Sequence, residues 1–290
     1  MFDVIIIGKG PAGLSAAIYT VRAGLKTLII GKNDSSLRKA DRIENYFGFS
    51  QPVSGEYLLE QGEMQAKRLG VKFENSEVIA IEKNEYFDIY TTEQNYSCKS
   101  VLLATGQQIV KVKIDRLTDF EGNGVSYCTT CDGFFYRGLK VGVVGYKDYA
   151  IHEAMELEPL TKDITIYTNG KELELTEKYN KIALNFTINK KVIKGLEGKD
   201  AIESIVFEDG TNENIDGLFI AFESASSIDF ARKLGVITNK SSIVVDEKQK
   251  TNLKGLYAAG DCTGGLKQVS TAVGQGAIAG KQMIEYIRNS

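Results

Sequence analysis

Cysteine and histidine are scarce in this sequence. Its 290 residues include four cysteines and one histidine. Four cysteines in a chain of this length do not make the disulfide framework of a small secreted protein. Structural zinc takes four ligands, and beside one Cys-x-x-Cys pair the chain offers only Cys98, Cys262 and His152, which are not suitably spaced. The composition therefore argues against a zinc site.

Long apolar runs and a strong net charge are missing as well. No run of about 18 apolar residues predicts a membrane-spanning helix. The net charge is only −3, and no basic run with interleaved aromatic residues points to nucleic acid. The first residues already form a strand pattern, without a basic leader or an apolar signal region. We therefore expect a cytoplasmic protein with no membrane or nucleic-acid partner.

The N-terminal stretch has the pattern of a dinucleotide-binding fold. An apolar run at residues 4–7 is typical of a strand buried on both faces, and a helical pattern begins at Leu14. Between them the chain reads Gly8-Lys9-Gly10-Pro11-Ala12-Gly13. In this context G-x-G-x-x-G lets the backbone approach a pyrophosphate at the helix N-terminus.

The second strand does not end as such folds usually do. It ends in Gly31-Lys32-Asn33, where an aspartate or glutamate usually binds an adenosine ribose. The turn alone therefore does not distinguish FAD from NAD. It also follows that the adenosine end of the cofactor must be held in another way.

Two later strand ends offer further backbone for a cofactor. One apolar strand ends in Ala104-Thr105-Gly106, where small residues allow close approach. Another ends in Gly260-Asp261 and is followed by a small-residue helix at residues 272–279. The carboxylate of Asp261 can accept from a ribityl hydroxyl, and the helix N-terminus can face the O2 atom of a flavin. An ordinary turn fits Gly260-Asp261 equally well.

Residues 128–131 form a Cys-x-x-Cys motif. Cys128 and Cys131 have the spacing with which redox-active disulfides close and reopen a small ring. Asp132 follows directly and places a proton donor beside the leaving thiolate. Two buried structural thiols are the alternative for the cysteines, and an N-cap or turn role is the alternative for Asp132. The spacing favours redox chemistry.

A second strand–turn–helix pattern follows this motif, but its nucleotide site is altered. The strand at residues 139–144 leads into Gly145-Tyr146-Lys147, so a long side chain stands where a glycine would meet pyrophosphate. After the next strand, residues 168–171 provide neither an arginine cluster for a 2′-phosphate nor a carboxylate for a free ribose. The pattern keeps the scaffold of a nucleotide-binding domain without its site.

In this order, the motifs resemble those of the low-molecular-weight thioredoxin reductases, from residue 2 to about residue 287. The resemblance implies an α/β fold of two Rossmann-like three-layer domains, assembled as a homodimer. It implies an FAD-binding domain at residues 1–113 and 243–290, with a central domain at 114–242 inserted into it. The implied FAD-binding residues are Gly8, Gly10, Pro11, Ala12, Gly13, Asn45, Ala104, Thr105, Gly106, Gly260, Asp261, Lys267, Gln268 and Val269.

The departures from the family pattern concern the pyridine nucleotide. Three parts of the NADPH site are replaced, the third by residues 222–227 where the family has a Gly-x-x-Pro-Asn turn. This combination resembles the ferredoxin-dependent flavin thioredoxin reductases. It implies electron flow from reduced ferredoxin, or flavodoxin, through FAD to thioredoxin. Cys131 is then the flavin-proximal sulfur, Cys128 the nucleophile toward thioredoxin and Asp132 the proton donor, with domain hinges near residues 112–116 and 240–244.

Three other functions remain open at this point. One is a thioredoxin reductase that uses NADPH or NADH through an atypical loop. Another is an FAD dithiol oxidase that passes electrons to oxygen. The last is a non-catalytic FAD-binding redox sensor, which the Cys-x-x-Cys-Asp motif disfavours.

Overall fold

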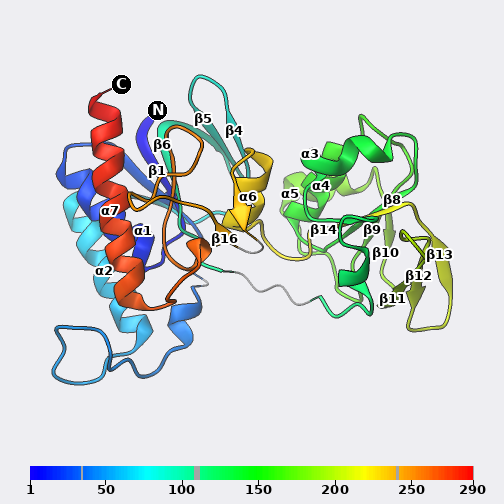
Figure 1. Ribbon diagram of the computed structural model, residues 1–290, viewed down its shortest axis with the longest axis horizontal. Helices are drawn as coiled ribbons and strands as arrows, with labels where there is room; N and C mark the ends of the chain where they lie inside the picture. The colour runs from blue at the N-terminus through cyan, green and yellow to red at the C-terminus, as the bar shows by residue number, and fades with distance from the viewer. Residues whose placement is uncertain (34, 108–111, 240–241, 290) are drawn as a thin grey trace. The chain divides into compact units, whose positions relative to one another are not determined.

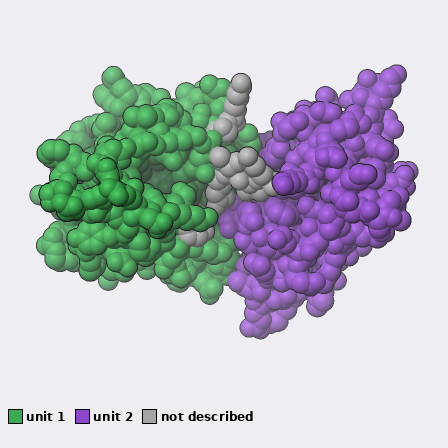
Figure 2. Space-filling model, turned by 90° about the horizontal axis from the view of Figure 1, so that it is seen from below, with its two compact units in different colours: residues 1–108, 226–290 green, residues 109–225 purple. Residues whose placement is uncertain are grey.

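The computed structural model describes residues 1–33, 35–107, 112–239 and 242–289. The chain forms two compact units, coloured separately in Figure 2. Unit 1 comprises residues 1–108 and 226–290, and unit 2 comprises residues 109–225. Unit 2 is thus inserted between the two parts of unit 1. None of the helices in the described ranges is long and apolar enough to cross a membrane.

Unit 1 is built on a seven-stranded sheet with the order β3-β2-β1-β6-β5-β4, in which β17 also pairs with β6. The parallel strands are β1 (Phe2–Ile7), β2 (Thr27–Ile30), β3 (Lys72–Glu74), β6 (Asn95–Leu103) and β17 (Leu256–Ala258). The antiparallel strands are β4 (Val78–Lys83) and β5 (Phe87–Thr91). Strand β5 pairs with the first half of β6, and β17 pairs with the last residues of β6. Both strands therefore fit along one edge of β6.

Two helices from opposite ends of the chain pack together in unit 1. They are α1 (Pro11–Arg22) and α7 (Val269–Arg288), which lie side by side in Figure 1. A Cβ at Gly276 would lie 2.1 Å from the carbonyl oxygen of Ala12, so only glycine permits this approach. Helix α2 (Gly55–Leu69) packs on α1; the Ser54 side chain caps its start and Gly70, with φ 101°, ends it.

Unit 2 repeats the same architecture on a smaller scale. Its parallel sheet has the order β10-β9-β8-β14-β7, with strands β7 (Val125–Ser126), β8 (Val141–Val144), β9 (Ile164–Tyr167), β10 (Thr187–Asn189) and β14 (Gly217–Ile220). A separate antiparallel sheet contains β11 (Ile193–Glu197), β12 (Ser204–Phe207) and β13 (Asn212–Asn214). The helices are α3 (Thr129–Asp132), α4 (Asp148–Leu157) and α5 (Glu177–Ala183). The predicted α/β fold with two Rossmann-like domains, the second inserted, is confirmed.

The second boundary between the two units lies earlier in the sequence than the expected domain boundary. The sequence analysis placed residues 226–242 in the central domain, whereas α6 (Ser227–Lys233) and β15 (Thr238–Asn239) belong to unit 1. The amide of Ser227 donates to Thr105 Oγ1 at 2.9 Å, and the amide of Ile237 donates to Asn252 Oδ1 at 2.9 Å. These bonds attach the segment to unit 1.

The segments predicted to act as hinges can be compared with this division. Residues 242–244 lie within unit 1, where β16 (Ser242–Ile243) pairs with β15, and residues 240–241 lie outside the described residues. On the other side, the amide of Asp115 donates to Lys194 O at 2.9 Å within unit 2. The division into units falls between residues 108 and 109 and between residues 225 and 226, and the hinges near 112–116 and 240–244 stay predictions.

Candidate active site

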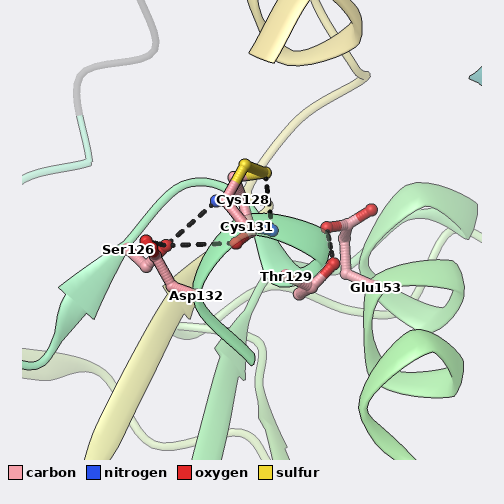
Figure 3. Close-up of a disulfide and its surroundings, with 6 residues drawn as sticks. All are labelled: Ser126, Cys128, Thr129, Cys131, Asp132 and Glu153. Carbon is pink, nitrogen blue, oxygen red and sulfur yellow. Dashed lines mark hydrogen bonds between the residues drawn. A yellow bond between two sulfur atoms is a disulfide. The ribbon is translucent and has the colours of Figure 1, made fainter. Parts of the chain in front are cut away.

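The two cysteines of the Cys-x-x-Cys motif form a disulfide in unit 2. The Sγ atoms of Cys128 and Cys131 are 2.04 Å apart, and their Cα atoms are 5.3 Å apart (Figure 3). Cys128 follows β7 and is the N-cap of the single-turn helix α3, where its sulfur accepts a hydrogen bond from the Cys131 amide at 3.2 Å. The helical turn thus sets the short distance that the disulfide bridges.

The two sulfur-bearing residues differ in exposure. Cys131 is exposed, whereas Cys128 is only 4 % exposed. The residue implied to attack thioredoxin is therefore the buried one, and the residue implied to face the flavin is the accessible one. A large protein partner needs a rearrangement to reach Cys128.

The Asp132 carboxylate is held beside the disulfide by a serine from the preceding strand. Ser126 Oγ lies 2.6 Å from Asp132 Oδ2 and 3.1 Å from the amide nitrogen of Cys128 (Figure 3). The hydroxyl therefore donates to the carboxylate while it accepts from the amide. Asp132 is the last residue of α3 and the N-cap residue of the following 3-10 helix η3 (Gly133–Tyr136), where its side chain makes no capping hydrogen bond.

A buried carboxylate lies beneath the cysteine turn, and the sequence analysis missed it. Glu153 in α4 is 2 % exposed, and its Oε2 atom accepts a hydrogen bond from Thr129 Oγ1 at 2.7 Å (Figure 3). Thr129 lies between the two cysteines and is 3 % exposed. The hydrogen bond attaches the Cys-x-x-Cys motif to α4. Because the two residues are 24 positions apart in the sequence, no local pattern predicted this contact.

In unit 1, the first glycine-rich turn has the geometry of a pyrophosphate cradle. Gly8 has φ +117°, and a Cβ there would lie 2.3 Å from the carbonyl oxygen of Ala104. Gly10 is the N-cap of α1 without a side-chain cap, and a Cβ on it would meet no atom within 4 Å. Pro11, Ala12 and Gly13 form the first turn of α1. Open space before an uncapped helix start fits the phosphate groups of a dinucleotide.

The strand end at Ala104–Gly106 lies against this turn and is fixed by a residue that the sequence analysis did not single out. The amide of Ala104 donates to the carbonyl oxygen of Ile7 at 2.8 Å. Ser227 Oγ lies 2.8 Å from Thr105 Oγ1 and accepts from the Thr105 amide at 3.1 Å. Gly106 has φ +73° and open space around its missing Cβ.

The C-terminal part of unit 1 brings in the remaining predicted cofactor residues. The amide of Gly260 donates to Gln275 Oε1 at 2.7 Å, and a Cβ on Gly260 would lie 3.2 Å from that of Ala12. Asp261 begins the 3-10 helix η4 (Asp261–Thr263) and is partly exposed.

The segment before α7 closes this group of residues. Asn45 Nδ2 donates to Gln268 Oε1 at 2.8 Å, which joins two predicted residues from distant parts of the chain. Lys267 Nζ donates to Gln107 Oε1, and Val269 is the first residue of α7. Unit 1 thus gathers the predicted cofactor residues at the carboxyl ends of its parallel strands, and the arrangement fits FAD.

The second nucleotide turn, in unit 2, is filled by its own side chains. Lys147 Nζ lies 2.5 Å from Glu223 Oε2, and the Tyr146 hydroxyl donates to Glu223 Oε1 at 2.9 Å. Burial alone lowers the pKa of Lys147, but the hydrogen bond and charge of Glu223 raise it above its ordinary value.

The start of α4 already carries an anionic residue. Asp148, the first residue of that helix, is 4 % exposed and accepts from the Thr176 amide at 2.9 Å. A carboxylate in this position takes the favourable interaction with the helix N-terminus that a nucleotide phosphate would otherwise have.

The two remaining cysteines lie outside this chemistry. Cys98 and Cys262 are buried free thiols, and burial raises the pKa of each to about 12. A thiol with so high a pKa has almost no thiolate at neutral pH and is a poor nucleophile. No group of three or more residues suited to a metal occurs within the described ranges.

Comparisons with known proteins agree with these features. The profile of the family described as pyridine nucleotide-disulphide oxidoreductase matches residues 2–276. The thioredoxin reductase of Peptoclostridium acidaminophilum is 32 % identical over 99 % of this chain and 97 % of its own length.

Solved structures give the same result. The crystal structure of the atypical thioredoxin reductase TRi from Desulfovibrio vulgaris Hildenborough is 40 % identical, with a TM-score of 0.96 over 100 % of this chain and 99 % of that one. The crystal structure of a ferredoxin-flavin thioredoxin reductase from Clostridium acetobutylicum is 32 % identical, with a TM-score of 0.71 over 100 % and 99 %. The chain therefore belongs to the pyridine nucleotide-disulphide oxidoreductase family, as an FAD-binding flavoprotein among the low-molecular-weight thioredoxin reductases.

Proposed function

We propose that this thioredoxin reductase takes its electrons from reduced ferredoxin, or from flavodoxin, and not from NADPH or NADH. The observation that carries the proposal is the turn after β8, where Lys147 is paired with Glu223. In a nucleotide-binding domain this turn brings bare backbone to the pyrophosphate. A side chain engaged in an ion pair takes up that space.

Electrostatics in unit 2 support the same conclusion. The buried carboxylate of Asp148 would lie beside any phosphate placed at the start of α4, and like charges repel most strongly where water is scarce. A relative described as a ferredoxin-flavin thioredoxin reductase, 32 % identical over the whole chain, adds support for a protein donor.

The FAD belongs, in this proposal, to the turn and strand ends of unit 1. The backbone at Gly8, Gly10 and Gly13 would hold the pyrophosphate, and the small residues Ala104–Gly106 would allow the cofactor to approach their backbone. Asp261 would accept from a ribityl hydroxyl, and Asn45 and Gln268, which bond to each other, would hold the flavin end. When bound, FAD supplies the capacity to take single electrons from the donor and to pass a pair to a disulfide.

The chain's own cysteines then carry the pair to thioredoxin. Reduction of the Cys128–Cys131 disulfide takes two electrons and two protons, and we assign one proton to Asp132. The Cys128 thiolate attacks the disulfide of thioredoxin, forms a mixed disulfide and releases one thioredoxin thiolate. Cys131 attacks the sulfur of Cys128, restores the internal disulfide and releases the second thioredoxin thiolate, so each turnover oxidises one dithiol and reduces one disulfide.

The family resemblance, rather than the burial of Cys128, gives the units a part in this sequence of steps. A thioredoxin disulfide cannot reach a residue that is 4 % exposed. We propose that unit 2 turns relative to unit 1 between reduction of the disulfide and attack on thioredoxin. The homodimer and the cytoplasmic location stay predictions.

Absorbance of the FAD-loaded protein without oxygen tests the donor. We expect no bleaching of the flavin by excess NADPH or NADH. Reduced ferredoxin with oxidised thioredoxin should yield thioredoxin thiols. Bleaching by either nucleotide would overturn the proposal, and peroxide formed in air on addition of a small dithiol would favour a dithiol oxidase.

A further inference from the structure

Lys9 occupies an unusual place inside the first glycine-rich turn. It lies between Gly8 and Gly10 and is only 9 % exposed, although lysine is rarely buried. Its Nζ atom lies 2.6 Å from Asn33 Oδ1 and 3.2 Å from Asn75 Oδ1. The ammonium group therefore donates to two side-chain carbonyls from distant parts of the chain.

These three residues follow three neighbouring strands at the same edge of the sheet. Lys9 comes after β1, Asn33 after β2 and Asn75 after β3, and the three strands are parallel and adjacent. Their carboxyl ends lie together for this reason. In dinucleotide-binding folds the adenosine ribose lies at the end of the second of these strands, where a carboxylate usually accepts from its hydroxyls.

Two buried side-chain oxygen atoms follow Asn75 directly in the sequence. Among the described residues, Ser76 Oγ and Glu77 Oε1 are buried side-chain atoms without a hydrogen-bond partner, and these residues are 3 % and 7 % exposed. The other oxygen of Glu77 accepts from Lys32, the neighbour of Asn33. Buried polar atoms without partners are uncommon, and a bound ligand is one group that can satisfy them.

We propose that Lys9, Asn33 and Asn75 form the subsite for the adenosine ribose of FAD. The ammonium of Lys9 donates to a ribose oxygen. The side-chain amides of Asn33 and Asn75 bond to the ribose hydroxyls, the role that a carboxylate has in other dinucleotide-binding folds. This assignment is independent of the electron donor, because it concerns only the FAD that the family binds.

Comparison of FAD with FMN tests this assignment, because FMN lacks the adenosine half. Apo protein is titrated with each flavin, and the quenching of flavin fluorescence gives the two dissociation constants. Lys9→Met keeps the length of the side chain and removes its charge. We expect FAD to bind about tenfold to a hundredfold more weakly, as loss of a hydrogen bond from a charged group predicts, with FMN unchanged. Lys72→Met, at the exposed start of β3, is the matched control and should leave both constants unchanged.

A second variant guards against misfolding at the buried position. Asn75 is exposed, so Asn75→Ala should fold normally and weaken FAD by about twofold to tenfold, again without an effect on FMN. Asp34 follows Asn33 in the sequence and offers a carboxylate as the ordinary alternative. If Asp34→Asn alone weakened FAD selectively, or if Lys9→Met and Asn75→Ala weakened FAD and FMN equally or not at all, the assignment would be wrong.

Discussion

Lys147 and Glu223 form an ion pair in unit 2 across 76 residues of sequence, with 2.5 Å between Nζ and Oε2. The Tyr146 hydroxyl donates to the same carboxylate, so one side chain fixes two residues of the turn. The side chains of Lys147 and Glu223 are 23 % and 35 % exposed. Because solvent screens such a pair, it adds little to stability, and its main effect is to keep the turn filled.

The double variant Lys147→Gly with Glu223→Ala should still not use NADPH. It removes the ion pair and restores a glycine, but the buried carboxylate of Asp148 and the lack of arginines at residues 168–171 remain. We expect the FAD absorbance to stay unchanged under excess NADPH without oxygen. The single variant Glu223→Gln should lower the free energy of unfolding by no more than about 1 kcal/mol. Flavin reduction in the double variant would mean that these two side chains alone close the site.

Single-cysteine variants should identify the sulfur that attacks thioredoxin. The suitable substrate is a thioredoxin without its second active-site cysteine, activated as a mixed disulfide with thionitrobenzoate. We expect the reduced Cys131→Ser variant to release thionitrobenzoate and form a stable covalent complex through Cys128, and Cys128→Ser to react far more slowly. Exposure alone predicts the reverse order, because Cys131 is exposed and Cys128 is not. Faster reaction of Cys128→Ser would assign the attack to Cys131.

Local sequence patterns predicted the parts of this molecule that depend on neighbouring residues. The glycine-rich turn at residues 8–13 and the disulfide of Cys128 and Cys131 each follow from a few adjacent positions. Lys147 was expected to obstruct the second nucleotide turn, and the structure places an ion pair there. Backbone approach and ring closure are local constraints, so a short motif expresses them fully.

Contacts between distant segments were not predictable in this way. Glu153 lies in the second turn of α4, and only the fold brings it under Thr129. The second boundary between the units lies at residues 225–226, earlier than the expected 242–243, for the same reason. Phe230, 1 % exposed, and the bonds between Ser227 and Thr105 attach α6 to unit 1, and no composition change marks that point.

Thr129→Val should destabilise unit 2. The variant keeps the shape of the side chain but removes the hydroxyl that donates to the buried Oε2 atom of Glu153. We expect the free energy of unfolding in urea, measured with the disulfide intact, to fall by about 1–3 kcal/mol. Glu153→Gln retains an acceptor for Thr129 and should cost less. Equal stability of Thr129→Val and wild type would show that the bond contributes nothing.

Asp132→Asn should slow the reduction of thioredoxin. The amide cannot supply the proton that we assign to the carboxylate, and general acid catalysis contributes about a hundredfold or more to a rate. The measurement is the single-turnover rate at which the FAD-reduced protein yields thioredoxin thiols. Ser126→Ala is the matched control, since it keeps the carboxylate and removes only the hydroxyl 2.6 Å from it, so its effect should be smaller. An unchanged rate in Asp132→Asn would contradict the assignment of Asp132 as proton donor and would favour a role in the turn.

The two buried thiols should make the protein less stable at alkaline pH. Burial raises the pKa of Cys98 and Cys262 from 9.0 to about 12 in the folded state. Between these values the unfolded chain loses thiol protons that the folded chain keeps. Unfolding is therefore favoured as pH rises from 9 toward 12, and the contribution is fully present below pH 9.

Each thiol should add to the slope of unfolding free energy against pH, by at most about 1.4 kcal/mol per pH unit. Urea unfolding at several pH values, on wild type and on Cys98→Ala and Cys262→Ala, measures this slope. Each substitution should flatten the curve above pH 9, where the unfolded thiol begins to ionise, and leave the shape of the curve below it unchanged. Iodoacetamide at pH 8 should accordingly modify the exposed Cys131 in the reduced folded protein and spare Cys98 and Cys262. Rapid labelling of Cys98 or Cys262 under these conditions would contradict their assignment as buried thiols.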